Sequence, residues 1–543
     1  MPPAAPTTPA PPTSSASTLS RMMRGTFWLA LKTPVAIVVA LWSIPLTQQY
    51  IGASANGAYV FAWGFGFLQF VLEFGMASAL QRQMVDAWTR GDRDGVDRTI
   101  ACGMTFYAVV AVIQMVVLAG IAYYGLPAKF RGNTLVLGLL WVQILTTPFF
   151  GMSAVVGGVL QAARRYEFIP RLELAIVVLR FALLWAGYQA GAPFLLVVAG
   201  QVAIQIGLSL GPSLWVMVKE LGYVPHFGGA RRSDFAAMFQ ISVYMALMQW
   251  SVVLADKVDT TVLGYALRED NLEFLITVYQ NVSKPFLQIR QTGWTLAYLV
   301  MPAVVSLAVG KDRDSLERIK YDGTRFLVAL LTPATLLAGI YAAPFLSLWV
   351  GARFAPYAPL LQLFLVATVP LVLSVIVQMA IGMGHIKVIA IASLVGALVN
   401  LPLSYYLTRT LGVSGVIWGT VLTTLFSNLL VPGIYAFKVL DIRYATFFVR
   451  TLSPPLAGAC GLVAACLAFR GVVPPGPVGP PGLSRTLPFL ANLGVGCLAY
   501  LAGYVAAPAG RGDAGAVARK LRGAGRGFAV AGRKVIGRPA LDA

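Results

Sequence analysis

The chain has 543 residues, of which 58% are hydrophobic and only 11% are charged. Soluble domains carry roughly 25% charged residues, so this composition excludes a water-soluble protein. The net charge of +20 does not indicate nucleic-acid binding, because the cations occur in short segments between apolar runs and at the C-terminal end, where they report membrane topology. The composition predicts a polytopic membrane protein.

The elements are taken in chain order. Segment 1–24 is rich in Pro, Ala, Thr and Ser, which predicts a disordered arm. The first apolar run has no small-residue cleavage pattern, so we expect it to be kept as a span. Apolar runs of about 18 residues or more then recur, each long enough to cross a hydrocarbon core of about 30 Å as a helix. We expect about 14 helices, at 26–50, 57–81, 99–124, 134–163, 170–189, 193–218, 236–262, 272–308, 325–350, 357–383, 386–408, 413–437, 448–469 and 486–508. A Pro-rich loop, 474–481, joins the last two.

Lysine and arginine are distributed unevenly between the two sets of loops. The termini and the loops on their side carry 29 of these residues, the opposite loops carry seven, and the remaining five of the 41 lie inside expected spans. The positive-inside rule therefore places both termini in the cytoplasm and requires an even number of spans. The basic tail at 518–539 is interpreted as a solvated segment attracted to anionic lipid, with a regulatory docking segment as the alternative.

Other residue types argue against an enzyme. The four cysteines lie in apolar runs without a CxxC pair, so they are interpreted as small buried hydrophobes rather than a metal or disulfide framework. The sequence has no G-x-x-x-x-G-K-[ST] motif, which argues against direct ATP hydrolysis. Every expected outer loop is short, which argues against a membrane glycosyltransferase or polymerase with a catalytic loop.

Two halves of the chain form an internal sequence repeat. Segment 48–63 matches 260–279, and 155–203 matches 375–422, in the order of helix end, turn, charge and glycine. Six helices separate each pair, so the halves share one orientation and predict two six-helix lobes related by an axis along the membrane normal. The alternative is the general compositional likeness of polytopic proteins. We expect an N-lobe at 25–220, a C-lobe at 221–440, two additional helices at 441–508 and a basic cytoplasmic tail at 509–543.

Three segments carry a resemblance to a known family. YIGASANGAYVFAWGFGFLQFVLEFGMASALQRQ (50–83) resembles the first two helices of bacterial polysaccharide and O-antigen flippases, of the multidrug/oligosaccharidyl-lipid/polysaccharide exporter superfamily. LADKVDTTVLGYAL (254–267) is similar to the same family, with an Asp shortly before an aliphatic-Gly pair. The block 348–422 shows the family's order of a Tyr-Ala-Pro helix entry, a small-residue helix, a basic turn and a Gly-Val-x-Gly loop.

The resemblance implies a function. Family members have two lobes around a central cavity that opens alternately to each side, lined by helices one, two, seven and eight. The implied substrate is a polyprenyl-diphosphate-linked oligosaccharide, moved to the outer leaflet of a bacterial inner membrane for cell-surface polysaccharide such as O-antigen of lipopolysaccharide or exopolysaccharide. Polysaccharide-assembly enzymes and membrane lipids are the implied partners. This chain departs from the commoner twelve-helix flippases by its last two spans, so a flippase for the peptidoglycan precursor lipid II remains an alternative. A multidrug exporter of the same superfamily, which needs an anionic cavity, is the other.

Ionisable side chains inside spans are candidates for the substrate site. At the bilayer centre such a group costs at least about 2.5–3.5 kcal/mol on insertion scales, so it usually faces a cavity or a partner. The candidates for binding the diphosphate are Lys32, Glu73, Arg180, Lys284 and Arg290. Arginine can meet a phosphate with a bidentate fork, and lysine meets it as a point charge. As alternatives, Lys32 and Arg180 could snorkel to the surface, Glu73 could pair with a cation, and Arg290 could lie at the interface.

A second group of residues is a candidate for ion coupling. Asp256 and Asp259 are three residues apart on the seventh expected helix and so would share a face, and Asn400 lies inside the eleventh. Two carboxylates and an amide oxygen could hold Na⁺, or one Asp could carry H⁺. A structural role for both Asp residues near the outer helix end is the alternative. No other cofactor or metal is expected.

Overall fold

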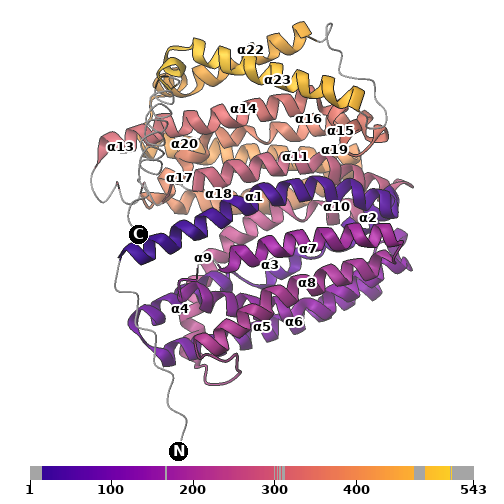
Figure 1. Cartoon of the computed structure of the whole chain (residues 1–543), viewed down its shortest axis with the longest axis vertical. Helices are drawn as coiled ribbons and strands as arrows, with labels where there is room; N and C mark the ends of the chain where they lie inside the picture. The colour runs from indigo at the N-terminus through magenta and orange to yellow at the C-terminus, as the bar shows by residue number, and fades with distance from the viewer. Residues whose placement is uncertain are drawn as a thin grey trace, which may run out of the picture. The chain divides into compact units, whose positions relative to one another are not determined.

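The structure is a computed structural model that describes residues 15–165, 168–298, 300–301, 304, 307, 312–469, 483–513 and 515. All regular elements in these residues are helices, and none is a strand (Figure 1). Eleven helical runs in this part of the chain are long and apolar enough to cross a membrane. The predictions of an all-α fold and of a multi-pass membrane protein are therefore confirmed.

Each of the fourteen expected ranges overlaps a helix or a run of helices. The ranges 170–189, 236–262 and 272–308 are not among the eleven apolar runs. In the helices that cover the first and third of these ranges, three charged side chains interrupt the apolar sequence. Two of the three ranges carry candidate substrate-binding cations: Arg180 in the first, and Lys284 and Arg290 in the third. The count of fourteen spans stays a prediction.

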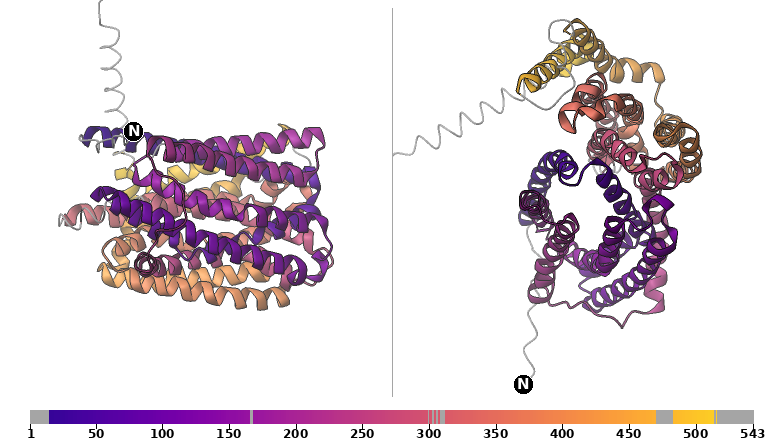
Figure 2. Two further views of the ribbon diagram at one scale, coloured as in Figure 1. Left: turned by 90° about the horizontal axis from the view of Figure 1, so that it is seen from below. Right: turned by 90° about the vertical axis from the view of Figure 1, so that its right-hand side faces the viewer.

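The described chain divides into two compact units, of which the first comprises residues up to Val282 together with Ala390–Thr423. Its helices run alongside one another (Figure 2, left). Its elements are α1 (Ser15–Ile51), α2 (Ala53–Gly64), α3 (Phe67–Leu72), α4 (Met76–Arg90), α5 (Arg93–Gly120), η1 (Ile121–Gly125), η2 (Ala128–Phe130), α6 (Thr134–Ala162), α7 (Phe168–Ala190), α8 (Phe194–Trp215), η3 (Val216–Glu220), α9 (Arg232–Asp256), α10 (Asp259–Ala266), the start of α11 (Leu272–Tyr298), most of α18 (Ile386–Leu411), and α19 (Val413–Thr424).

The second unit comprises Ser283–Ile389 and the residues after Thr424. It holds the rest of α11, then α13 (Arg313–Arg318), η4 (Ile319–Gly323), α14 (Thr324–Ile340), α15 (Ala342–Trp349), η5 (Ala352–Tyr357), α16 (Ala358–Val366), η6 (Val369–Leu373), α17 (Ser374–Gly382), η7 (Leu425–Leu430), α20 (Val431–Val439), α21 (Tyr444–Phe447), η8 (Phe448–Leu452), α22 (Ser453–Phe469) and α23 (Leu483–Ala506). The lobe boundaries expected from the repeat stay a prediction.

Small residues bring the last two helices close together. A Cβ atom at Gly458 would lie 2.8 Å from the ring of Tyr500, and one at Gly503 would lie 2.5 Å from the carbonyl oxygen of Ala457. The pair α22 and α23 packs on α14 through a cluster that includes Leu337 and Leu462. Close backbone approach at small residues is a usual way of packing helices in lipid, where the hydrophobic effect does not drive association.

The termini of the chain are only partly described. Helix α1 begins at Ser15, so the expected disordered arm 1–24 is helical from that residue onward, while residues 1–14 lie outside the described residues. The Pro-rich loop 474–481 and the basic tail segment 518–539 also lie outside them.

The expected second span, 57–81, is three helices rather than one. Gly66 separates α2 from α3, and Phe74 and Gly75 separate α3 from α4 with positive φ angles of 55° and 68°. The side chain of Trp250 on α9 donates to the carbonyl oxygen of Val71 at 2.9 Å. Its ring also packs edge-on against Phe74, with 4.6 Å between ring centroids. A helix can break within a membrane where a neighbouring helix satisfies its backbone in this way.

The expected seventh span is also interrupted. Helix α9 ends at Asp256, and α10 begins at Asp259 after a turn at Lys257 and Val258. The expectation that Asp256 and Asp259 share one face of a continuous helix is therefore wrong. The break instead places Asp259 in the first turn of a new helix, where a carboxylate is favoured by the unpaired N–H groups and the helix dipole.

Candidate functional site

Asp259 is the best-formed of the ionisable sites expected from the sequence. Its side chain is buried, with 4% of the residue exposed. Oδ2 accepts hydrogen bonds from the Tyr279 hydroxyl at 2.6 Å and from Thr420 Oγ1 at 3.0 Å. The three residues come from α10, α11 and α19 of the first unit. A buried carboxylate is costly unless it is hydrogen-bonded, and these two hydroxyl groups meet that requirement.

Asn400 belongs to the same region of the first unit. Its Oδ1 accepts a hydrogen bond from Ser404 Oγ at 2.8 Å, one turn further along α18. A Cβ atom at Gly419 would overlap Ser404 Oγ, so α18 and α19 are in contact there. Thr420, which bonds Asp259, is the next residue after that glycine. Thr420 thus bonds Asp259 directly, and its neighbour Gly419 packs against Ser404, which bonds Asn400. We call Asp259, Tyr279, Thr420, Ser404 and Asn400 the Asp259 cluster.

The Asp259 cluster offers one carboxylate among neutral amide and hydroxyl oxygens. Oxygen ligands of this kind suit hard cations, and a single negative charge matches a monovalent ion or a proton. Within the described residues there is no group of three or more His, Cys, Asp or Glu side chains that could hold a metal ion. The sequence predicts Asp259 and Asn400 as candidates but gives no signal for Tyr279, Ser404 and Thr420, because single hydroxyl residues are common in membrane helices and form no pattern.

Lys32 on α1 and Arg180 on α7 both belong to the first unit. Lys32 Nζ on α1 forms an ion pair with Glu173 Oε2 on α7 at 2.7 Å, with both side chains partly buried. Arg180, two turns further along α7, donates from Nη1 to Gln205 Oε1 on α8 at 2.7 Å. The seven-residue spacing of Glu173 and Arg180 puts them on one face of α7. That spacing was the sequence signal that could have identified Glu173.

Glu73 has neutral partners. It lies at the break between α3 and α4, where its Oε1 accepts from the Tyr107 hydroxyl at 2.8 Å and its Oε2 is 3.5 Å from Gln249 Nε2. These partners come from α5 and α9, whereas the helices around Lys32 and Arg180 are α1, α7 and α8. The structure thus gathers the candidate charges of the first unit into two groups rather than one.

The other two candidate cations belong to the second unit. Lys284 is exposed on α11, and Arg290 lies two turns further along with its Cζ atom 5.2 Å from the ring centroid of Phe286. Phe286 is buried and stacks on Phe364 of α16, with 5.0 Å between centroids. The aromatic pair therefore fixes the helix turn from which Arg290 extends.

A buried polar seam joins the start of α11 to α1 and α2 in the first unit. Gln48 Nε2 donates to Asn281 Oδ1 at 2.7 Å. Asn56 Nδ2 donates to Thr277 Oγ1 at 3.1 Å and to Gln280 Oε1 at 2.8 Å. Paired amides of this kind hold one register between helices, because a shift would leave buried polar groups unpaired.

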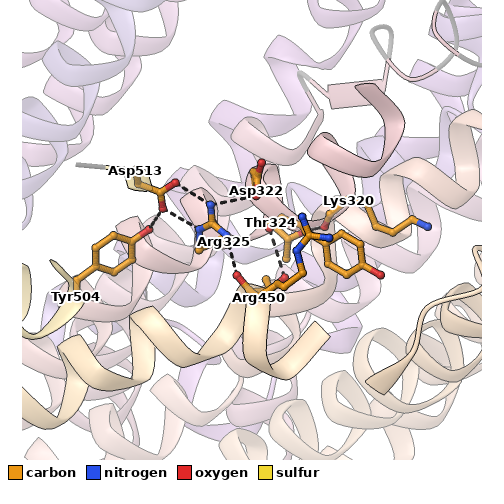
Figure 3. A network of polar contacts seen from close by, with 9 residues as sticks. Lys320, Asp322, Thr324, Arg325, Arg450, Tyr504 and Asp513 are labelled. Atoms are coloured by element: carbon orange, nitrogen blue, oxygen red, sulfur yellow. Dashed lines mark hydrogen bonds and ion pairs between the residues drawn. The ribbon is translucent and has the colours of Figure 1, made fainter. Parts of the chain in front are cut away.

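The second unit has its own polar cluster, at the start of α14 (Figure 3). Arg325 is buried and donates to the two carboxylate oxygens of Asp513 from Nε and Nη2, each at 2.7 Å. Its Nη1 donates to the carbonyl oxygen of Arg450 at 2.7 Å, and Asp322 lies 3.0 Å from Nη2. The Tyr504 hydroxyl donates to Asp513 Oδ2 at 2.5 Å. Asp513, which lies beyond the end of α23, is therefore tied to the start of α14.

This geometry can be compared with known proteins. No family model matches the chain. It is 23% identical over 463 residues to the uncharacterized membrane protein EpsK of Bacillus subtilis, which covers 81% of this chain and 87% of that protein. Among solved structures it is similar to the lipid II flippase MurJ, with a TM-score of 0.65, 13% identity, and 88% of this chain and 97% of that chain covered.

A multidrug resistance transporter of the MATE family is a second structural relative. For its inward-facing conformation the TM-score is 0.56 at 14% identity, with 75% of this chain and 96% of that chain covered. At such identities the likeness concerns the fold. The chain therefore has the helical transporter fold that MurJ shares with the MATE transporters of the MOP superfamily.

Proposed function

We propose that the chain is a transporter of the MOP superfamily that moves a polyprenyl-diphosphate-linked oligosaccharide from the cytoplasmic to the outer leaflet by alternating access. Three observations support it: the fold, the resemblance of residues 50–83, 254–267 and 348–422 to polysaccharide flippases, and the cations held inside apolar helices. The observation that carries the choice of a diphosphate-linked lipid over a cationic drug is the positive charge of those helices, and the resemblance favours an oligosaccharide as its head group. Lipid II, the substrate named for MurJ, is the alternative cargo.

The charges inside these helices can be counted together with their partners. Lys32 and Glu173 neutralise each other, and the Arg180 guanidinium donates to the neutral amide of Gln205. Helix α11 adds Lys284 and Arg290 against a single acid, Glu273 in its first turn. Positive charge therefore exceeds negative charge on each of α7 and α11, and such an excess suits a diphosphate. A transporter of cationic drugs needs the opposite excess.

The Asp259 cluster supports ion coupling in this proposal. Protonation of Asp259, or a Na⁺ ion held by its carboxylate and the neighbouring hydroxyl and amide oxygens, would neutralise the buried charge. Because the cluster joins α10, α11, α18 and α19, a change of its charge alters how these four helices pack. An ion gradient could reset the transporter through that change.

The substrate is tested by deleting the gene and analysing the lipid-linked precursors of the cell. We expect an oligosaccharide on a polyprenyl diphosphate to accumulate on the inner leaflet. Accumulation of lipid II instead would favour the alternative cargo.

Complementation with Lys284→Ala and Arg290→Ala should fail at normal expression, whereas Lys387→Ala, which removes an exposed cation outside α11, should restore export. Normal export by both α11 variants would remove these residues from the mechanism.

Ion coupling is tested on the purified protein. A ligand that binds only the folded state raises the melting temperature in proportion to its concentration over its Kd. We expect NaCl, compared with choline chloride, to raise the Tm of the wild type, or acidification to do so if the ion is H⁺. The nearly isosteric Asp259→Asn should abolish this response, and Thr420→Val should weaken it. A response that survives in Asp259→Asn would contradict the assignment.

A further inference from the structure

A cavity of about 250 Å³ lies in the first unit, at the end of α8 that meets the loop between α6 and α7. Its lining includes Arg165 from that loop, Phe168 and Arg171 from the first turn of α7, and Trp215 and Glu220 from the end of α8 and from η3. None of these residues belongs to the Asp259 cluster or to the candidate substrate-binding residues. The cavity therefore needs an explanation of its own.

The cavity combines two guanidinium groups with one carboxylate. Arg165 Nη2 forms an ion pair with Glu220 Oε2 at 2.5 Å, and 46% of the Arg165 side chain remains exposed. Arg171 places its Cζ atom 5.1 Å from the ring centroid of Trp28 on α1. A guanidinium carries five N–H donors in a fork that matches the oxygens of a phosphate, and two of them are among the described residues of the lining. The chemistry of the cavity is therefore that of an anion site with aromatic walls.

The residue types around the cavity are those common at the depth of the lipid headgroups. Trp215 is the last residue of α8, within the apolar run Phe194–Glu220, and 59% of it is exposed. Tryptophan is enriched where the membrane meets water, because its ring is apolar and its N–H is polar. Arg165 follows the end of the apolar run Thr134–Ala162 by three residues, at the same end of the bundle.

A lane without side chains leads from the cavity along α8. Gly207 and Gly211 precede Trp215 by eight and four residues, so all three lie on one face of the helix. Both glycines are exposed, and a Cβ atom at either would meet nothing within 4 Å. Glycine weakens a helix relative to alanine, and no neighbour among the described residues requires its small size here. The lane has the shape to receive an extended acyl chain beside the cavity.

We propose that the cavity binds the phosphate of an anionic membrane phospholipid through Arg165 and Arg171, with Trp215 beside the glycerol region and one acyl chain along Gly207 and Gly211. The two glycines also fit the G-x-x-x-G pattern of paired helices, which makes a second copy of the chain the competing occupant. A helix pair needs no arginine-lined cavity at the end of its lane, and that observation favours the lipid. This site is separate from the proposed transport site, so its test needs no transport assay.

The test measures retained lipid on the full-length protein by native mass spectrometry in detergent. Phosphatidylglycerol, phosphatidylcholine and inorganic phosphate are the probes. We expect the wild type to retain phosphatidylglycerol in preference to phosphatidylcholine.

Arg165→Gln should lower the apparent affinity about tenfold, as expected for one charge-assisted hydrogen bond. Arg165→Lys keeps the ion pair with Glu220 but loses the forked geometry of the guanidinium. Its affinity for the lipid should therefore lie between those of the wild type and Arg165→Gln. Gly211→Leu fills the lane without meeting the rest of the chain and should also reduce retention.

Two matched variants control the result. Lys219→Gln removes an exposed cation of the same helical turn that does not line the cavity, and Gly120→Leu adds a side chain at an exposed helical glycine with open space on α5. Both should retain lipid as the wild type does. An equal loss in Lys219→Gln, equal retention of phosphatidylcholine, or displacement of the lipid by millimolar phosphate would each overturn the proposal. So would a Gly211→Leu variant that loses a dimer but keeps its lipid.

Discussion

At the scale of single residues, the structure replaces bare charges with charges that have partners. Lys32 was a candidate for binding the diphosphate in a cavity, and the structure places its ammonium group in an ion pair with Glu173. A paired lysine can still bind a diphosphate if the acid shares it, and it can also be a purely structural link between α1 and α7. The two roles differ in what happens when both partners are neutralised together.

A double substitution distinguishes these roles. We expect Lys32→Gln to abolish glycan export and the double variant Lys32→Gln with Glu173→Gln to remain inactive, because the phosphate has lost its cation in both. Glu173→Gln alone should retain export. Export and expression are measured in the deletion strain. Recovery of export in the double variant would instead show that the lysine served only to neutralise the acid.

Asp513 gives a prediction with a defined pH dependence. Burial raises the pKa of its carboxyl, but the hydrogen bonds from Arg325 and Tyr504 and the Arg325 charge outweigh that effect, so the net pKa lies below its usual value of 3.8. A carboxyl with a lowered folded-state pKa stabilises the protein above the unfolded pKa, and the contribution is lost as the pH falls through the folded value.

The corresponding measurement compares thermal unfolding of the wild type and Asp513→Asn across pH. At pH 7 we expect the variant to unfold at a lower temperature, with a cost of about 1–2 kcal/mol for weakening charge-assisted hydrogen bonds at a partly exposed site. The difference should shrink as the pH is lowered below about 4, where the wild-type carboxyl begins to protonate. A difference independent of pH would mean that the ion pair with Arg325 contributes nothing to stability.

At the scale of elements, the interruptions of the helices matter more than their number. Helix α10 begins at Asp259 only because the expected seventh span breaks after Asp256, and the break gives the carboxylate a helix N-terminus. The expected second span breaks twice, and side chains of α9 satisfy the backbone at the second break. Hydrophobic periodicity does not report such breaks, because the residues on either side remain apolar.

Close packing between elements predicts the effect of one methyl group. A Cβ atom at Gly57 on α2 would overlap the carbonyl oxygen of Glu273 on α11, beside the polar seam of Asn56 and Thr277. We expect Gly57→Ala to destabilise the protein by about 2 kcal/mol or more, because a backbone atom cannot move aside without separating the helices. Tryptophan fluorescence during thermal unfolding in detergent measures the loss.

Gly120→Ala is the matched substitution. Its Cβ atom would meet nothing within 4 Å on α5, and alanine favours a helix over glycine, so a neutral or slightly stabilising effect is expected. Equal destabilisation by the two alanines would show that the α2–α11 contact is not as tight as the structure has it.

At the scale of the whole molecule, the distribution of cations predicts the orientation in the membrane. In a variant with its four cysteines replaced, single cysteines at Arg131 and Arg353 should react with a membrane-impermeant thiol reagent added to intact cells. Cysteines at Arg90 and Lys387 should react only after the membrane is opened. All four positions are exposed in the structure. Labelling of Arg131 and Arg90 from the same side would contradict the predicted topology and the even number of spans.

The sequence by itself determined the class of the protein, because 58% hydrophobic residues in long runs have no other stable arrangement than helices in a bilayer. Each of its fourteen expected ranges overlaps a helix, and it singled out Asp256, Asp259 and Asn400 as candidates for ion coupling, which stays a prediction. It could not place Tyr279, Ser404 and Thr420 around them, since these residues come from helices far apart in sequence and meet only when α10, α11, α18 and α19 pack. The partners of Lys32 and Arg180 were likewise decided by tertiary structure. Periodicity reports which residues avoid lipid, whereas hydrogen bonds between helices depend on which faces meet.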